Sequence, residues 1–539
     1  MTAQSPLFAQ TVEDGFKYLR NEEYAKARAA FKAAASSDPS AKNLYYLGNF
    51  YLALDKPDSA ATLFQQALEK DRKEPLVHVG LAELDLIKKN AEGAAEHFDD
   101  ADHYARDRDA ETYYRIGQAY LRHGTNNAKE AIAAFSKAVD IDGKNPKYYV
   151  GLGNAYLESN NASKASQNYE QAIYFDANYA PAYVAVGSLY LRSKNYNEAR
   201  DQYNKAVEAD PNFAPAYKEL GNLFYRFQQY GNAAENYGKF VQLGEPTQDE
   251  LLTYAGYLYL NKQYDESLQQ LEKVGSDYPN PIVHRLLAYD YFETKQYQPG
   301  TEQMTIFMQE AKPEDIIAQD YETQGRLAMA AGDTTTGISG LVHAANMDTS
   351  KVGLLKEVAL IYYDQHKFDE AGDMFDTMMQ KGVDLSATDL FRLGLSRYFA
   401  DEYGKADSAF AKVNETAETS LPGWVWRARA NAKIDSTSEQ GLAKPFYEKV
   451  IELASADSTK NESELIEANR YLGYYYFLQA DQENSEKYLN DVLALNPEDE
   501  TAKTLLDAIE AGQIGKLSGG GEPSDSGSTG TDSSGAASR

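Results

Sequence analysis

One short segment concentrates side chains that could hold a metal ion. It runs His97-Phe98-Asp99-Asp100-Ala101-Asp102-His103. If it is helical, Asp99 and His103 share a face, and imidazole with carboxylate suits a borderline divalent metal. His97 falls on a different face from His103, so the three side chains would not converge. The sequence favours an exposed acidic helix face here, and we predict no metal site and no cofactor; a metal at Asp99 and His103 stays a hypothesis.

Sequence motifs for catalysis are missing. The chain contains no Gly-x-x-x-x-Gly-Lys-Ser/Thr phosphate loop, no Gly-x-Ser-x-Gly elbow and no His-Glu-x-x-His zinc helix. Its seven histidines are scattered, and paired carboxylates such as Glu22-Glu23 lie in polar contexts. Acid–base catalysis needs a desolvated, convergent pair. We therefore predict no catalytic residues and a protein that is not an enzyme.

The charge balance restricts the class of partner. The 539 residues include 53 Lys and Arg against 82 Asp and Glu, a net charge of −29. Nucleic-acid binding requires clustered basic side chains that neutralise phosphates, and anionic membranes also attract basic segments. No apolar run approaches the roughly 18 residues of a membrane helix. The chain has no cysteine, which excludes disulfides and thiolate chemistry. We predict that nucleic acid is not a partner and that the chain does not insert into a membrane.

A short sequence pattern recurs along the chain and predicts the helices that would carry the side chains named above. The pattern occurs as Leu47-Gly48-Asn49-Phe50-Tyr51, as Leu152-Gly153-Asn154-Ala155-Tyr156 and as Leu220-Gly221-Asn222-Leu223-Phe224. An Ala follows each Gly by twelve residues, and an aromatic residue follows by sixteen. Small anchor residues recur at intervals of mostly 33 to 37 residues. This spacing predicts pairs of helices, each pair leaving apolar faces that only stacking on its neighbours can bury.

This pattern resembles the tetratricopeptide repeat family, in which a Leu-Gly pair and an aromatic residue are followed by Ala, a second aromatic residue and Pro. The resemblance covers about residues 8–498 in about 14 units. It implies an all-α fold, a right-handed superhelical solenoid of antiparallel helical hairpins. We expect repeats 1–7 over 8–247, more divergent repeats 8–14 over 248–498, a capping helix over 499–512, a disordered Gly/Ser-rich tail over 513–539 and an N-terminal tail over 1–7.

The family resemblance also implies a binding surface. In such repeats the concave groove is lined by first-helix residues three before the small anchor, one after it, and four to five after it. Amides at these places can bond a peptide backbone, and Arg can bind a carboxylate with two hydrogen bonds. The alternative is that they are ordinary exposed polar residues. The predicted groove residues are Tyr45, Asn49, Tyr114, Gln118, Arg122, Asn154, Arg192, Lys218, Asn222 and Arg226; Arg20 occupies an equivalent place.

These observations predict a non-catalytic scaffold or adaptor that binds peptide segments of other proteins, either acidic segments or free C-termini. The alternative is a structural component of a bacterial cell-envelope assembly that uses outer edges and polar insertions. The insertions, predicted to be loops, lie at 416–422, 435–440 and 455–462. The tyrosine-rich sequence and polar tail are similar to envelope-associated repeat proteins of Gram-negative bacteria, which implies a periplasmic location, with the cytoplasm as the alternative.

Overall fold

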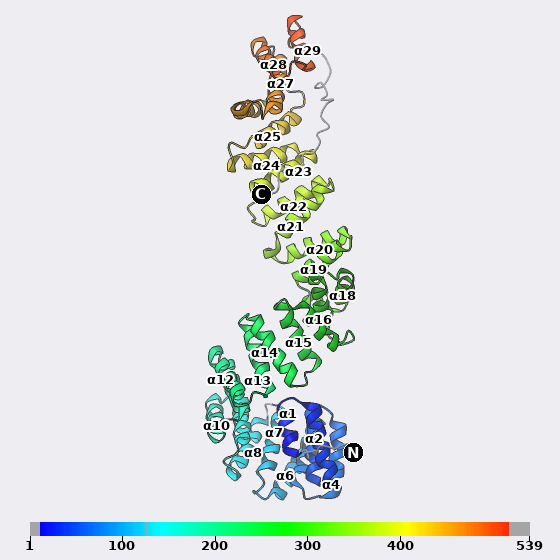
Figure 1. The fold of residues 1–539 in the computed structure, drawn as a ribbon, viewed down its shortest axis with the longest axis vertical. Helices are drawn as coiled ribbons and strands as arrows, with labels where there is room; N and C mark the ends of the chain where they lie inside the picture. The colour runs from blue at the N-terminus through cyan, green and yellow to red at the C-terminus, as the bar shows by residue number, and fades with distance from the viewer. Residues whose placement is uncertain (1–10, 125–126, 517–539) are drawn as a thin grey trace, which may run out of the picture. The chain divides into compact units, whose positions relative to one another are not determined.

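The computed structural model describes residues 11–124 and 127–516. Within these ranges every regular element is a helix, arranged as successive packed pairs, so the predicted all-α hairpin array is confirmed (Figure 1). The pairs run from α1 with α2 to α27 with α28, and α29 follows them. None of the described helices combines the length and the apolar character needed to span a membrane.

The recurring Gly and aromatic residues hold each hairpin together. Tyr169 is fully buried, and a Cβ built on Gly153 would overlap its ring. The same relation joins Gly48 to the buried ring of Phe64 in an earlier repeat. Only a residue without a side chain lets the two helices approach this closely. The small anchor of the repeat is therefore a packing requirement, as the spacing predicts.

The chain divides into two compact units, residues 1–307 and 308–539. The predicted division near residue 247 falls within the first of these units and stays a prediction. The helices of the first unit are α1 (Val12–Arg20), α2 (Tyr24–Ser37), α3 (Ala41–Ala53), α4 (Pro57–Lys70), α5 (Pro75–Ile87), α6 (Ala91–Ala105), α7 (Ala110–Arg122), α8 (Ala128–Ile141), α9 (Pro146–Glu158), α10 (Ala162–Phe175), α11 (Ala180–Arg192), α12 (Tyr196–Ala209), α13 (Ala214–Arg226), α14 (Tyr230–Leu243), α15 (Gln248–Leu260), α16 (Tyr264–Val274), α17 (Ile282–Glu293) and α18 (Tyr297–Glu310). The boundary between the two units, after residue 307, falls within α18.

The buried aromatic residue of the second helix changes type along the first unit. Where the small anchor is glycine, the ring packs on it, and the Tyr169 hydroxyl also donates to Asn154 on the first helix of its hairpin. This change distinguishes the early hairpins from the later ones. The residue is Phe31, Phe64, Phe98 and Phe135 in the first four hairpins, and Tyr169, Tyr203 and Tyr237 in the next three.

The first hairpin contacts the seventh within the first unit. The backbone N–H of Glu245 donates to the carbonyl oxygen of Glu22 over 2.8 Å, and the Glu245 carboxylate accepts from the N–H of Ala25. Lys218 of α13 lies 3.3 Å from Glu22 and also pairs with Glu250. In Figure 1 the first hairpin accordingly lies beside later helices of its own unit. The segment 244–247, at the predicted boundary between repeats 7 and 8, is thus bonded to the α1–α2 turn through Glu245.

The second unit repeats the hairpin plan with a different core. Its largest fully buried side chain in the described residues is Arg397 of α23, whose guanidinium pairs with Asp369, Asp373, Asp376 and Glu402. The helices are α19 (Ala318–Ala330), α20 (Thr334–Met347), α21 (Leu354–Asp364), α22 (Phe368–Gln380), α23 (Ala387–Phe399), α24 (Tyr403–Thr416), α25 (Leu421–Ile434), α26 (Lys444–Ala454), α27 (Glu462–Leu478), α28 (Gln482–Leu495) and α29 (Glu500–Glu510), with short 3-10 turns η2 (Pro313–Asp315), η3 (Thr349–Lys351) and η4 (Ser455–Asp457).

The last helix covers the open face of the array. Leu505 and Ile509 of α29 are buried against Phe477 and Leu489 of the preceding hairpin, so a helix forms within the predicted capping segment 499–512. The predicted loops connect helices, but they also contain helical residues: Thr416 ends α24, Leu421 and Pro422 begin α25, Ser455–Asp457 forms η4 and Glu462 begins α27. The predicted tail over 1–7 and residues 517–539 of the predicted tail over 513–539 lie outside the described residues.

Candidate functional site

Two of the predicted groove residues lie in the core instead. Tyr45 is completely buried and stacks on Phe64, with 5.7 Å between the ring centroids, and Asn49 is 4% exposed. The expectation that first-helix residues at these places face a partner is wrong for this hairpin. Side chains of α1 and α7 pack against the adjacent residue, Tyr46.

The side chains that pack against Tyr46 are Phe16 of α1 and Arg115 of α7. The Arg115 guanidinium lies 4.3 Å from the ring centroid of Phe16, and Phe16 packs edge-on against Tyr46. Arg115 is itself buried and pairs with Glu111 over 2.7 Å. Burial opposes ionisation of Glu111, but Arg115 and Lys147 outweigh it and lower its pKa to about 2. The early hairpins therefore complete their own interior with an internal ion pair.

The Tyr114 and Gln118 side chains continue this internal network. The amide nitrogen of Gln118 donates to the Tyr114 hydroxyl over 2.9 Å, and its amide oxygen accepts from Arg115 over 3.0 Å. Both side chains are half-buried. Gln118 thus uses its acceptor and one donor inside the unit, which leaves little capacity for a peptide backbone.

Two predicted cations are already paired with carboxylates of the same unit. Arg122 donates to Glu83, which is 1% exposed, and His123 lies 3.2 Å from the same carboxylate. Lys218 belongs to the junction with Glu22 and Glu250. Since a buried carboxylate without its cation is costly, Arg122 has a structural role.

The remaining groove residues lie at the surface of hairpins five to seven. Asn154, Arg192 and Arg226 are exposed, and Asn222 is half-buried. The Arg192 side chain is 55% exposed and lies 3.5 Å from the Glu158 carboxylate. Arg226 forms no ion pair with another residue in the described part of the chain. The structure thus leaves four polar first-helix side chains accessible on α9, α11 and α13.

The two asparagines are oriented by tyrosines that the sequence analysis did not select. The Tyr169 hydroxyl donates to the Asn154 amide oxygen over 2.8 Å, and the Tyr257 hydroxyl donates to the Asn222 amide oxygen over 2.9 Å. Each amide oxygen is occupied, and neither amide nitrogen donates to a described residue. For Asn154, the change from Phe to Tyr at the buried aromatic position of the second helix after Phe135 is the sequence signal that could have revealed this contact; Tyr257 lies on α15, outside that series.

The metal hypothesis at Asp99 and His103 is replaced by a different group. Both of these side chains are exposed on α6. Among residues 11–124 and 127–516, the group with metal-ligand spacing is His78, His97 and Asp100, whose candidate atoms lie within 4.8 Å of one another. The spacing within α6 does not reveal this group, because His78 comes from the neighbouring helix α5.

Comparisons with known families identify the repeat. Family models described as tetratricopeptide repeat match residues 18–84, 122–186 and 250–281, and one described as TPR repeat matches residues 187–227. Together with the array of hairpins, these matches make the chain a tetratricopeptide-repeat protein, as its spacing predicts. Such repeats generally mediate protein–protein interaction, and proteins built from them are generally not catalysts.

Individual relatives are similar over limited lengths. Tetratricopeptide repeat protein 8 of Mus musculus is 32% identical over 87 residues, which span 16% of this chain and 17% of that protein. The C-terminal part of a TPR repeat-containing protein from Cytophaga hutchinsonii is 30% identical, with 47% of this chain and 99% of that chain covered and a TM-score of 0.31. PilF of Pseudomonas aeruginosa is 19% identical, with 45% and 93% covered and a TM-score of 0.29.

Proposed function

We propose that the protein is a non-catalytic scaffold that binds extended peptide segments of partner proteins along α9, α11 and α13. The observation that carries this proposal is the orientation of Asn154. The Tyr169 hydroxyl occupies its amide oxygen, while its N–H donors bond no described residue and the side chain is exposed. A fixed amide donor is suited to a backbone carbonyl of an extended peptide, and its orientation lowers the entropy lost on binding.

The two exposed arginines favour a peptide that carries carboxylates. Arg226 has no competing ion pair among the described residues, and the Arg192–Glu158 pair is exposed. Exposed pairs of this kind contribute at most about 1 kcal/mol, so a partner carboxylate can replace Glu158 at little cost. The guanidinium can then form two parallel hydrogen bonds with the ligand. Acidic side chains and free C-termini both supply such a carboxylate.

The contacts of each arginine determine which variants can test the proposal. Arg122 is unsuitable for charge reversal, because the change would leave Glu83 buried without its cation. Arg192→Glu with Arg226→Glu reverses two exposed charges without this cost. Arg200→Glu is a matched control, since Arg200 lies on the second helix α12 and pairs only with its neighbour Asp201 among the described residues.

The experiment selects short random peptides on the full chain and then measures their affinities by titration calorimetry. We expect enrichment of acidic or C-terminally free peptides, and a loss of at least about tenfold in affinity for the Arg192→Glu/Arg226→Glu variant. The Arg200→Glu control should bind as the wild type does. Equal affinity in all three proteins would reject this surface and favour the alternative, a structural component that uses outer edges and insertions.

A further inference from the structure

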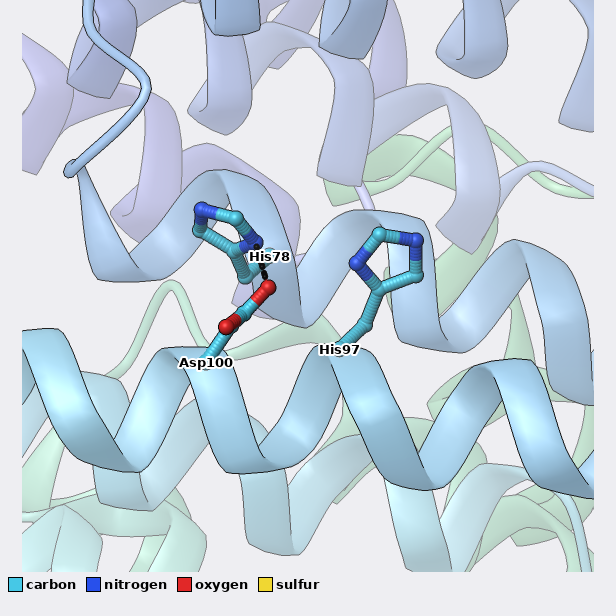
Figure 2. A group of neighbouring side chains, drawn as sticks. All are labelled: His78, His97 and Asp100. Carbon is cyan, nitrogen blue, oxygen red and sulfur yellow. Dashed lines mark ion pairs between the residues drawn. The ribbon is translucent and has the colours of Figure 1, made fainter.

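A second group of side chains, on the α5–α6 hairpin, has no role in the proposed peptide surface. His78 lies on α5, and His97 and Asp100 lie one helical turn apart on α6. Figure 2 shows His97 and Asp100 facing His78 across the space between the two helices. The candidate ligand atoms lie within 4.8 Å of one another. The three side chains thus converge on one point of the hairpin.

The hydrogen bonds of His78 determine which nitrogen faces that point. Its Nε2 lies 2.8 Å from the carbonyl oxygen of Arg72, which can only accept, so Nε2 carries the proton. The Nδ1 atom is left with its lone pair, and it lies 3.4 Å from the Asp100 carboxylate. His78 is 6% exposed, and its Nδ1 has no hydrogen-bond partner. A buried lone pair facing a carboxylate is unfavourable unless a cation or a proton lies between them.

His97 repeats this arrangement from the other helix. Its Nε2 points toward the Asp85 carboxylate, 3.9 Å away, while its buried Nδ1 has no hydrogen-bond partner and is directed toward His78 and Asp100 (Figure 2). The two rings lie 5.8 Å apart between centroids, and Tyr104 packs against the His78 ring. Metal-binding histidines commonly use their second nitrogen in this way, toward a backbone carbonyl or a carboxylate.

We propose that His78, His97 and Asp100 bind a divalent transition metal, of which Zn²⁺ is the best match, and that the ion joins α5 to α6. Two imidazoles and one carboxylate are a ligand set that suits Zn²⁺. The metal would approach both Nδ1 atoms at about 2.0–2.1 Å, and water would complete a tetrahedral site. The ion would neutralise Asp100 and satisfy both unpartnered nitrogens. The other nitrogen of His78 is held by the Arg72 carbonyl, and that of His97 faces the Asp85 carboxylate.

The test titrates ZnCl₂ into the full chain, prepared without an affinity tag and stripped of metal, and follows the heat by calorimetry. We expect one ion per chain for the wild type. His97→Gln and Asp100→Asn should each weaken binding by about 100-fold or more, because each removes one of three ligands. His103→Gln is the matched control, because His103 is exposed on the same helix and lies outside the group; this variant should bind like the wild type.

A second measurement separates this site from adventitious binding to surface histidines. Zn²⁺ should raise the thermal unfolding midpoint of the wild type and of His103→Gln, but not that of His97→Gln or Asp100→Asn. His97 and Asp100 are partly or fully exposed, so their variants are expected to fold, whereas the buried His78 is a less informative target. Absence of wild-type binding, or equal binding by all variants, would overturn the proposal and leave only the His78–Asp100 ion pair.

Discussion

The backbone N–H of Ala25 donates to both carboxylate oxygens of Glu245, at 2.9 and 2.8 Å, although 220 residues separate the two in the chain. Ala25 lies in the first turn of α2, where backbone N–H groups have no partner within the helix. The residue that precedes α2, Glu23, forms no side-chain cap. Glu245 therefore caps this helix from the seventh hairpin and places its negative charge at the positive end of the helix.

Glu245→Ala should release the first hairpin from this contact. Loss of a charged cap costs about 1–2 kcal/mol, which corresponds to roughly a tenfold rise in amide exchange if α2 opens locally. Hydrogen exchange followed by mass spectrometry over residues 18–31 measures this. Glu235→Ala is the control, since Glu235 is exposed on α14 and pairs with Lys239. Unchanged exchange in Glu245→Ala would mean that the cap does not stabilise α2.

Tyr169→Phe should remove the hydroxyl that orients Asn154 while keeping the packed ring. We expect a loss of about 1 kcal/mol in the free energy of unfolding, because one partly buried hydrogen bond is lost. Peptides that bind through Asn154 should also bind a few-fold more weakly, since the amide is no longer fixed. Urea unfolding and calorimetry measure the two effects. Tyr174→Phe is the control because Tyr174 is 79% exposed, and an equal effect there would contradict the role of Tyr169.

Gly153→Ala should destabilise the first unit by about 1–3 kcal/mol, because the added methyl group overlaps the Tyr169 ring in a close-packed contact. Gly256→Ala provides the comparison. A Cβ at Gly256 meets only the tip of Leu286 at 4.0 Å, so this change should raise helix stability by about 0.5–1 kcal/mol. Urea midpoints of the two variants should therefore move in opposite directions, and an unchanged or raised midpoint for Gly153→Ala would show that Gly153 is not a packing requirement.

Asp290 of α17 should make stability depend on pH in an unusual direction. Its side chain is fully buried, and burial raises its pKa to about 8, with the Ser267 hydroxyl opposing part of the rise. The folded state then holds a proton that the unfolded chain releases near its ordinary pKa of about 3.9. The contribution of Asp290 to stability is therefore present at low pH and is lost as pH rises from about 4 to about 8.

Asp290→Asn should remove this pH dependence. The difference in unfolding free energy between variant and wild type should shift in favour of the variant between pH 5 and pH 8, by up to about 1.4 kcal/mol per pH unit. Urea midpoints measured across this range test the expectation. The exposed Asp277→Asn serves as the control and should follow the wild type. A constant difference across the range would mean that Asp290 is ionised in the folded protein.

The local pattern of the sequence predicted the hairpins because their contacts lie close together in the chain. Gly153 and Tyr169 are sixteen residues apart, and helical periodicity places both on facing surfaces. The capping helix α29 was predicted for the same reason, since its apolar face is visible in Leu505 and Ile509. These contacts repeat along the chain, so the pattern in each hairpin supports the prediction of the next hairpin.

The binding surface was only partly predictable because it depends on contacts between distant repeats. Tyr45 occupies the same repeat position as Lys218, yet Tyr45 is buried and Lys218 is partly exposed. Tyr45 packs on Phe64 and Tyr46, and Phe16 and Arg115 cover Tyr46 only after the hairpins have stacked. His78 and His97 likewise approach each other from two helices. The spacing of residues within one helix cannot predict a contact between side chains of two helices.

The bond between Ala25 and Glu245 also has a consequence for synthesis. A ribosome adds about 5–20 residues per second, so the 220 residues between the two require roughly 10–45 s. During that interval the nascent α2 lacks its cap while six further hairpins emerge. The N-terminal end of the array is therefore completed only after the seventh hairpin has been translated, and a ribosome that stalls before Glu245 leaves an unfinished end exposed to chaperones and proteases.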